Sequence, residues 1–315
     1  MNQLPNFFLV GAVKAGTTAF HDMLSQHPEI YMAPIKEPNF FAQPDLQPNL
    51  YTDQYRRSVS FDISRYVKGT MRQVIHIADV NNWDDYHLLF KNVRHERAIG
   101  EGSNSYLYCS SVAQHIARQL PHAKIIMILR NPVERAWSHY LMNRKLGYPV
   151  RPDFLEEIHE DTRAQPQGWG ITANYFRLGL YSEQVERFLS AFPSCQVKIT
   201  LYDDFHRAPR ETLSDTFEFL DVNPTFNVDL HTQKNKAALP RWPSLQGALQ
   251  RSSMSHAIKR KMPSSIKTVI EKILLDHTKL PKLGELERQT LANLYDCDIR
   301  KLEKILSRTL DHWLA

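Results

Sequence analysis

The sequence begins with a phosphate-binding loop whose lysine stands in an unusual place. The apolar residues Phe7–Val10 predict a short buried strand, and the segment GAVKAGTT follows directly. A strand, a glycine-containing loop and a helix start in this order indicate an anion site, because backbone N–H groups converge at a helix N-terminus. Gly11 and Gly16 have the spacing of a P-loop, which in nucleoside-triphosphate proteins carries lysine directly after the second glycine. Here that residue is Thr17, and the lysine is Lys14, inside the loop.

Strand and helix patterns alternate along the chain. Short apolar runs predict buried parallel strands at Phe7–Val10, Ala98–Gly100, Lys124–Leu129 and Val197–Leu201. Helices are predicted at Thr17–Gln26, Ser111–Gln119, Pro132–Leu146, Ser182–Phe192 and Pro209–Leu220. This alternation predicts βαβ units and an α/β fold, with a P-loop-like, mostly parallel sheet flanked by helices.

The chain is interpreted as one α/β domain over residues 1–315 with two insertions. Residues 42–97 are less regular than their surroundings, and residues 235–284 contain a loop followed by the basic segment 251–282. A solvated helix face or an anion-binding surface would each account for that basic segment. Leucines at helical spacing in Glu285–Leu314 predict a C-terminal helix that packs on the body of the domain.

Composition limits the classes of function. The net charge of +5 suits an anionic ligand but is too small to indicate nucleic acid binding. The three cysteines have no metal-ligand or disulfide pattern, and none of the 14 histidines lies in a paired metal-binding motif, so we expect a cytoplasmic protein without a metal site. No apolar run is long enough to predict a membrane span, and the sequence indicates no oligomeric state.

A second anion-binding signal lies at the end of the third predicted strand. A triphosphatase ends a neighbouring strand in Asp to hold Mg²⁺, but here the strand is followed by Arg130. Arginine is a phosphate ligand rather than a metal ligand. Ser138 lies two turns into the next predicted helix and offers a hydroxyl to the same phosphate. Arg130 and Ser138 therefore add a second set of candidate phosphate ligands to those of the loop.

These segments resemble the sulfotransferases that use 3′-phosphoadenosine 5′-phosphosulfate (PAPS). KAGTT looks like their 5′-phosphosulfate loop, and RNPVERAWS looks like their 3′-phosphate motif. KEPNFF is similar to the segment that carries the catalytic glutamate in the carbohydrate (heparan-type) branch, and GEGSNSY resembles the substrate-side strand end of that branch. The resemblance covers most of the chain. It implies PAPS as co-substrate, adenosine 3′,5′-bisphosphate (PAP) as product, and no metal.

The resemblance assigns roles to individual residues. It implies that Glu37 and Lys14 are catalytic, and that the nucleotide is bound by Lys14, Ala15, Gly16, Thr17, Thr18, Arg130 and Ser138. A later loop, interpreted as a cover over the nucleotide, adds Lys236 and Arg241. Candidate substrate residues are Lys36, Glu101, Ser103 and His76. The chain departs from the family pattern at Gly102, where lysine is common, and at Asn39, where the animal glycan enzymes tend to have histidine. A long heparan-like substrate is therefore disfavoured.

The residue types suggest an in-line sulfuryl transfer. Lys14 can neutralise the charge that grows on the leaving phosphate, and Glu37 can take the proton of the acceptor hydroxyl or amine. We therefore expect a metal-independent sulfotransferase acting on a small polar metabolite or a sugar. A nucleoside-triphosphate-dependent kinase is the alternative enzyme. A non-catalytic nucleotide-binding module is the alternative from another class, and Glu37 separates it from an enzyme because such a module needs no base.

Overall fold

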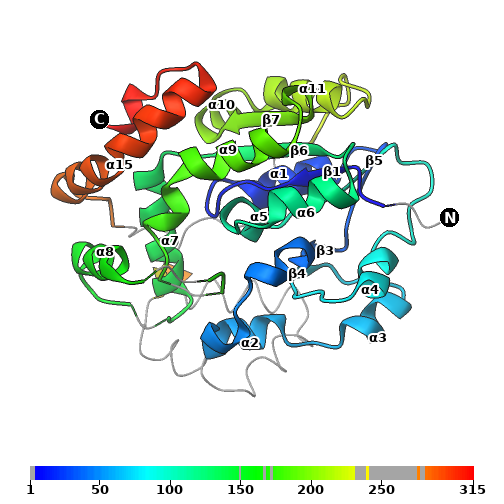
Figure 1. The fold of residues 1–315 in the computed structure, drawn as a ribbon, viewed down its shortest axis with the longest axis horizontal. Helices are drawn as coiled ribbons and strands as arrows, with labels where there is room; N and C mark the ends of the chain where they lie inside the picture. Colours follow the sequence, from blue (N-terminus) through cyan, green and yellow to red (C-terminus); the bar gives the residue numbers. More distant parts are fainter. Residues whose placement is uncertain are drawn as a thin grey trace.

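The computed structural model describes residues 4–148, 150–165, 168–170, 173–230, 239–240, 275–276 and 281–315. Its strands are β1 (Phe7–Leu9), β2 (Ile30–Met32), β3 (Ile35–Glu37), β4 (Ile75–Ile77), β5 (Ala98–Glu101), β6 (Lys124–Leu129), β7 (Val197–Leu201), β8 (Leu239–Pro240) and β9 (Leu275–Asp276). Its α-helices are α1 (Thr17–Leu24), α2 (Asp53–Val59), α3 (Ile63–Lys68), α4 (Trp83–Leu88), α5 (Ser105–Tyr108), α6 (Val112–Gln119), α7 (Pro132–Lys145), α8 (Phe154–Arg163), α9 (Tyr181–Ala191), α10 (Tyr202–Arg207), α11 (Pro209–Phe219) and α15 (Glu285–Leu306). Figure 1 shows their arrangement. The 3₁₀ turns are η1 (Phe40–Asp45), η2 (Pro48–Leu50), η3 (Arg177–Gly179), η4 (Ser194–Gln196) and η5 (Asp311–Trp313).

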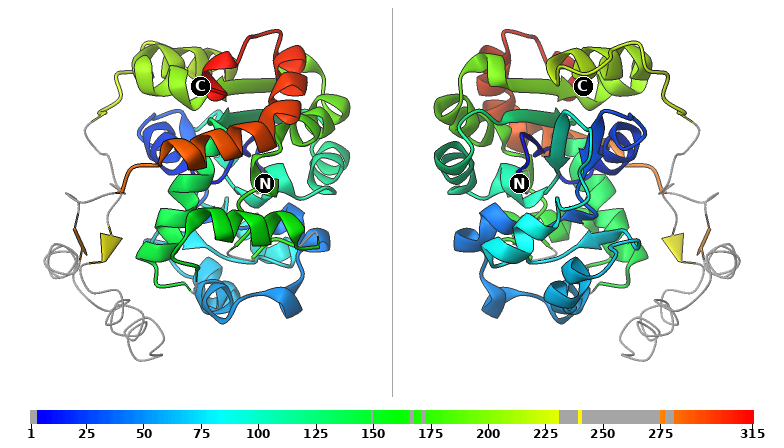
Figure 2. Two further views of the ribbon diagram at one scale, coloured as in Figure 1. Left: turned by 90° about the vertical axis from the view of Figure 1, so that its left-hand side faces the viewer. Right: turned by 90° about the vertical axis from the view of Figure 1, so that its right-hand side faces the viewer.

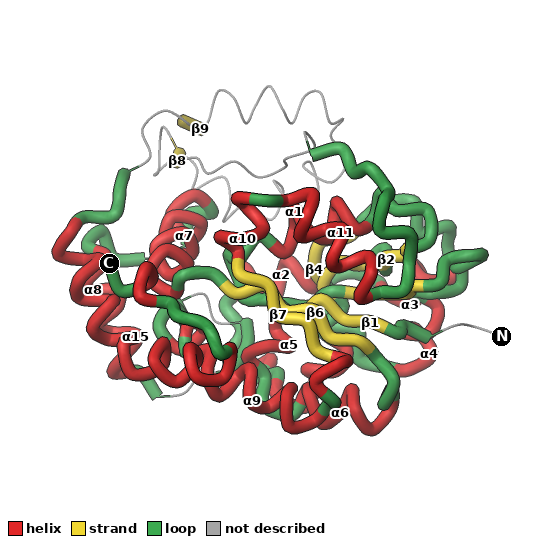
Figure 3. Tube along the Cα trace, turned by 90° about the horizontal axis from the view of Figure 1, so that it is seen from above, coloured by secondary structure: helices red, strands yellow, loops and turns green. Residues whose placement is uncertain are grey.

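A five-stranded parallel sheet forms the centre of the fold. Its strand order is β2-β5-β1-β6-β7, and β1 pairs with β5 on one side and β6 on the other. Helices cover both faces, with α1, α10 and α11 on one and α5, α6 and α9 on the other (Figure 3). The sheet is buried on both sides, since Ile125–Leu129 in β6 are fully inaccessible to solvent. The predicted α/β class with a mostly parallel sheet is therefore confirmed.

The predicted strands are present, and the prediction missed five more, including the two-residue strands β8 and β9. Strands β1, β5, β6 and β7 match the four apolar runs to within one residue at each end. The prediction missed β2 at the sheet edge, and β3 and β4, which pair in parallel as a separate small sheet. Each of the three spans only three residues, too few to establish an alternating pattern.

The C-terminal helix packs on the body as predicted, but it ends earlier. Helix α15 contacts α9 and α7 through buried residues that include Leu291, Tyr295 and Leu302. It stops at Leu306, because Ser307 adopts a left-handed conformation with φ of 49°. The short turn η5 then follows and buries Trp313. Leu294, which the sequence pattern placed on the packed face, is 38% exposed.

The irregular segment 42–97 forms short elements on one side of the main sheet. Helices α2, α3 and α4 gather with β3 and β4 below the sheet in Figure 1, and both views of Figure 2 keep this group together. That the segment is an insertion stays a prediction, as does the insertion over 235–284, most of which lies outside the described residues. No helix in the described ranges combines the length and apolar character needed to cross a bilayer.

Candidate active site

The carboxyl ends of the central strands open onto one pocket of about 910 Å³. Strand β1 leads into the glycine loop, β6 into Arg130 and β7 into Tyr202, so adjacent strands deliver these residues to one edge of the sheet. The lining contains most of the residues singled out from the sequence: Lys14, Gly16, Thr17, Thr18, Glu37, His76, Arg130 and Ser138. Segments more than 100 residues apart in the chain thus meet at one cavity.

The glycine loop has the backbone geometry of an anion cradle. Lys14 has φ of 68° and Gly16 φ of 86°, so two left-handed residues turn the chain sharply into helix α1. The N–H groups of the first turn of α1 have no intrahelical acceptor and are free for an anion. Gly11 is needed for close approach, because a Cβ there would lie 2.8 Å from the Thr17 methyl group and 2.9 Å from a backbone nitrogen of β6.

Ala15 lies in the interior of the loop. Its side chain is fully buried, and its N–H donates to the carbonyl of Ala12 at 3.1 Å. It therefore shapes the loop from inside. Its predicted contact with the nucleotide stays a prediction.

Lys14 is a cation without an acidic partner in the described part of the chain. Its ammonium lies 3.7 Å from the sulfur of Met142. Burial, and then the nearby charges of Arg130 and Lys145, lower the Lys14 pKa from 10.5 to about 8. An anion in the pocket would offset this cost, and binding would raise the pKa again.

Arg130 lies against the same loop. Its guanidinium donates to the Lys14 carbonyl at 3.0 Å and stacks over the Tyr202 ring at 4.9 Å. An ion pair with Glu134 at 3.9 Å holds it from the other side. Ser138 lies two turns along α7 and lines the same pocket. The structure therefore brings Arg130 and Ser138 together with the loop, as predicted, while their binding role stays a prediction.

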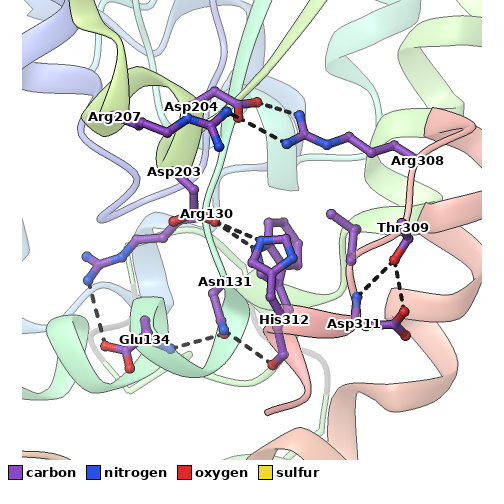
Figure 4. Close-up of polar contacts among 12 residues, drawn as sticks. Arg130, Asn131, Glu134, Asp203, Asp204, Arg207, Arg308, Thr309, Asp311 and His312 are labelled. Atoms are coloured by element: carbon purple, nitrogen blue, oxygen red, sulfur yellow. Dashed lines mark hydrogen bonds and ion pairs between the residues drawn. The ribbon is translucent and has the colours of Figure 1, made fainter.

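The C-terminal turn braces the segment that carries Arg130. The Asn131 amide donates to the Trp313 carbonyl at 3.2 Å, while its oxygen caps α7 by accepting from the Val133 N–H at 2.9 Å. The Trp313 indole donates in turn to Asp203 at 3.0 Å, and His312 lies 3.3 Å from the same carboxylate (Figure 4). The end of the chain thus locks together the strand ends of β6 and β7.

Glu37 is the last residue of β3, and its carboxylate points into the pocket. The carboxylate is only 5% exposed, and its Oε1 accepts from Lys36 at 2.8 Å and from the Asn104 amide at 2.9 Å. His76 on the neighbouring strand β4 lies 3.8 Å from the same oxygen. Among the described residues Oε2 accepts no hydrogen bond, so one oxygen is held while the other is available to a ligand. Lys36 is therefore paired with Glu37 in the interior, and it does not line the pocket.

Asn104 joins Glu37 to the glycine loop. Its amide oxygen accepts from the Thr17 hydroxyl at 3.0 Å while its NH₂ group donates to Glu37. The sequence interpretation quoted the segment that contains Asn104 but assigned it no role. Its place in the segment that follows a predicted strand was the available signal, since such segments face the ligand site of a parallel sheet.

Glu101 and Ser103 lie beneath the pocket and not on its lining. Glu101 is fully buried and accepts from Tyr106 at 2.6 Å, from Tyr86 at 3.1 Å and from Ser103 at 3.1 Å. Burial raises the pKa of this carboxyl to about 7. Asn39, also buried, donates its N–H to the Ser103 hydroxyl at 3.1 Å. Direct contact of Glu101 or Ser103 with a substrate stays a prediction, and the burial of both disfavours it.

Aromatic side chains that the sequence interpretation did not single out line the pocket near Glu37. They include Tyr55 and Trp169, whose indole N–H donates to the Tyr55 hydroxyl at 3.1 Å. Tyr202 lines it beside Arg130. Only Tyr202, which directly follows a predicted strand, could have been inferred from sequence order.

Lys236 and Arg241, the candidates from the covering loop, lie outside the described residues, as does the basic segment 251–282 apart from 275–276 and 281–282. Within the described ranges no group of three His, Cys, Asp or Glu side chains is arranged to hold a metal. Within the described residues, the positive charges at the pocket come from lysine and arginine side chains.

The chain matches proteins of known family over most of its length. Residues 5–226 match the model of the sulfotransferase family. The bifunctional heparan sulfate N-deacetylase/N-sulfotransferase 2 of Bos taurus is 27% identical over 228 residues, which are 72% of this chain and 23% of that protein. Human carbohydrate sulfotransferase 15 is 24% identical over 278 residues, which are 76% of this chain and 47% of that protein. This chain therefore spans less than half the length of these curated relatives.

One solved structure resembles the whole chain. The crystal structure of a sulfotransferase from Alicyclobacillus acidocaldarius is 28% identical, with a TM-score of 0.72, and the match covers 99% of this chain and all of that one. The family match begins before β1, includes the glycine loop and Arg130, and ends beyond helix α11. With these residues assembled around one pocket, the chain belongs to the sulfotransferase family.

Proposed function

We propose that this protein transfers the sulfuryl group of PAPS to a hydroxyl or amine of a small polar metabolite or a sugar. The observation that carries the proposal is the meeting of Lys14, Arg130, Ser138 and Glu37 at one pocket. Two separate cations suit a ligand with phosphates at both the 5′ and 3′ positions. A partly held carboxylate beside them suits proton removal from an acceptor.

Each residue has a distinct part in the proposed reaction. The loop N–H groups and Lys14 hold the 5′-phosphosulfate, and Arg130 with Ser138 holds the 3′-phosphate. The bond between sulfur and the bridging phosphate oxygen breaks as the acceptor oxygen or nitrogen bonds to sulfur. Lys14 neutralises the charge left on the phosphate, and the free oxygen of Glu37 accepts the acceptor's proton. No step requires a metal.

The alternatives predict different ligands. A nucleoside-triphosphate-dependent kinase would prefer ATP with Mg²⁺, but in this pocket the strand end after β6 carries Arg130 where such an enzyme has an acidic metal ligand. A non-catalytic nucleotide-binding module would bind PAP without needing Glu37. The buried ion pair that orients Glu37 favours an enzyme, because a carboxylate is costly to bury without a use.

Calorimetry tests the nucleotide, and a transfer assay tests the reaction. PAP should bind clearly more tightly than AMP or ATP, and ³⁵S-labelled PAPS should label an acceptor from a panel of sugars and small polar metabolites. Activity should survive excess EDTA to within a small factor. A preference for ATP, or a complete Mg²⁺-reversible loss under EDTA, would contradict the proposal. The proposal also includes a cytoplasmic location for this protein.

A further inference from the structure

We infer that Asn104 is a positioning residue that ties the Glu37 base to the phosphate loop, an inference that rests on the proposed function. A continuous chain of side-chain hydrogen bonds connects the loop to Glu37 through Asn104. The Thr17 hydroxyl donates to the Asn104 oxygen at 3.0 Å, and the Asn104 NH₂ group donates to Glu37 Oε1 at 2.9 Å. One amide therefore links the anion cradle to the base.

The side-chain amide of Asn104 forms this link and does not cap the helix that follows it. Asn104 precedes helix α5 in the N-cap position, where an asparagine side chain ordinarily accepts a hydrogen bond from a backbone N–H of the first turn. Here it makes no such cap, and its backbone is already helical. The side chain instead points into the pocket that Thr17 and Glu37 line.

Both sequence neighbours of Asn104 are locked by the buried network beneath it. The Ser103 hydroxyl donates to Glu101 at 3.1 Å, and the Ser105 hydroxyl donates to the Asn39 side chain at 2.6 Å. Ser103 and Ser105 are inaccessible to solvent. The backbone at position 104 is therefore fixed from both sides, and the amide is held ready for its two partners.

The Thr17 end of the link is also fixed. The Thr17 methyl group occupies the space that a side chain at Gly11 would need, at 2.8 Å from an ideal Cβ, so the rotamer is set by close packing. Its hydroxyl has a single proton, which is donated to Asn104. Backbone N–H groups of the loop, Lys14 and Thr18 are then left to hold the anion, and the Thr17 hydroxyl acts on the base side.

The link has a chemical consequence for Glu37. The NH₂ donor of Asn104 stabilises the charged carboxylate and holds Oε1, so the proton of the acceptor goes to Oε2. The other titratable groups that face Glu37 are Lys36 at 2.8 Å, His76 at 3.8 Å, the carboxyl group of Glu101 and the hydroxyl group of Tyr55. Among these described residues around Glu37, only Asn104 also forms a hydrogen bond with the loop.

Asn104→Ala and Asn104→Asp test the link, with the exposed Asn92→Ala as matched control. Loss of the amide donor should lower turnover at neutral pH by about tenfold or more and move the acid limb of the kcat profile to higher pH, because a charged Glu37 loses a hydrogen bond. Asn104→Asp keeps the acceptor for Thr17 but faces Glu37 with a like charge, so its acid limb should move further. PAP affinity should stay within about twofold of wild type in Asn104→Ala, whereas the carboxylate added by Asn104→Asp beside the anion cradle should weaken it.

Thr17→Val, which keeps the shape and removes the hydroxyl, tests the other end. It should lower turnover with little change in PAP affinity, and the double variant Thr17→Val/Asn104→Ala should be no slower than Asn104→Ala alone. Acid limbs that match the Asn92→Ala control, additive effects, or a tenfold loss of PAP affinity in Thr17→Val with normal turnover would overturn the inference. Asn104→Asp is nearly isosteric and keeps the test valid if Asn104→Ala does not fold. A wild type that binds no PAP would instead overturn the proposed function, and this inference with it.

Discussion

The two sides of the pocket are built in different ways. The loop side, defined by Lys14, Gly16, Thr18, Arg130 and Ser138, comes from two short motifs that directly follow strands of one sheet. The Glu37 side, defined by Glu37, Tyr55, His76 and Trp169, comes from a separate small sheet, helix α2 and a loop near residue 169. The loop side depends on local backbone geometry, and the Glu37 side depends on contacts between distant segments.

The difference separates binding from chemistry. A cradle of N–H groups and cations recognises phosphate wherever a strand leads into a helix, so it can be retained while the acceptor changes. The Glu37 side positions one carboxylate through Lys36 and Asn104, and aromatic side chains line the same pocket. Variants on the two sides should therefore affect different steps, and the predictions below test that division.

The largest effect is expected from Glu37→Gln. Removal of the base should lower turnover by roughly 10²–10⁴-fold. PAP affinity should stay within about twofold of wild type, since the nucleotide contacts that we propose lie on the loop side. Transfer of label from ³⁵S-labelled PAPS measures the first quantity and calorimetry the second. The exposed Glu186→Gln is the matched control. Near-normal turnover on a confirmed acceptor would place the base elsewhere and remove the chemical distinction between the two sides.

Arg130→Ala should produce the next largest effect, now on binding. A charge-assisted hydrogen bond contributes roughly 1.5–3 kcal/mol, so PAP affinity should fall by about ten- to a hundredfold. AMP, which lacks the 3′-phosphate, should bind almost as it does to wild type. Arg207→Ala on α10 removes a guanidinium that is 78% exposed and serves as the control. Equal losses for PAP and AMP would show that Arg130 shapes the pocket without reading the 3′-phosphate.

The same division explains how much the sequence could predict. Lys14, Arg130 and Ser138 were found because a phosphate loop and a strand end are local patterns, and the structure brings them together. Asn104 and Trp169 escaped notice because their roles depend on partners 67 and 114 residues away. The strands β1, β5, β6 and β7, of three to six residues, were predicted from apolar runs, but the three-residue strands β2, β3 and β4 were not. Short strands are stabilised by the neighbours they pair with and carry little pattern of their own.

Glu101 lies beneath the Glu37 side, and Glu101→Gln should change how the free energy of unfolding depends on pH. The folded-state pKa of Glu101 is raised from 4.5 to about 7, so the native state holds this proton more tightly than the unfolded chain. Its contribution to the free energy of unfolding is therefore full below pH 4.5 and is lost as the pH rises to 7. Glutamine cannot titrate, so between pH 5 and 7 the wild type should lose about 1–2 kcal/mol more than the variant.

Urea unfolding at pH 5, 6 and 7 measures this difference, with Glu186→Gln again as control. Parallel stability curves for wild type and Glu101→Gln would show that the Glu101 carboxyl titrates normally despite its burial, and that the three hydroxyl donors fully offset the cost of the charge.

Lys14→Met should have the smallest effect on the free energy of unfolding. The pH dependence of this effect should have the opposite sign to that of Glu101→Gln. The folded-state pKa of Lys14 is lowered from 10.5 to about 8, so the native state holds this proton less tightly than the unfolded chain. The resulting cost is full below pH 8 and disappears as the pH rises to 10.5.

Methionine removes the charge and keeps the length, so at pH 7 the variant should be more stable than wild type by about 1 kcal/mol, reduced by the solvent that fills the pocket. The gain should be smaller at pH 9.5. PAP should stabilise the wild type strongly and the variant weakly, because the charge that burial makes costly is the charge that we propose to bind phosphate. Thermal and urea unfolding with and without PAP measure both effects, and a variant that is less stable than wild type at pH 7 would show that Lys14 supports the fold of the loop as well as its ligand.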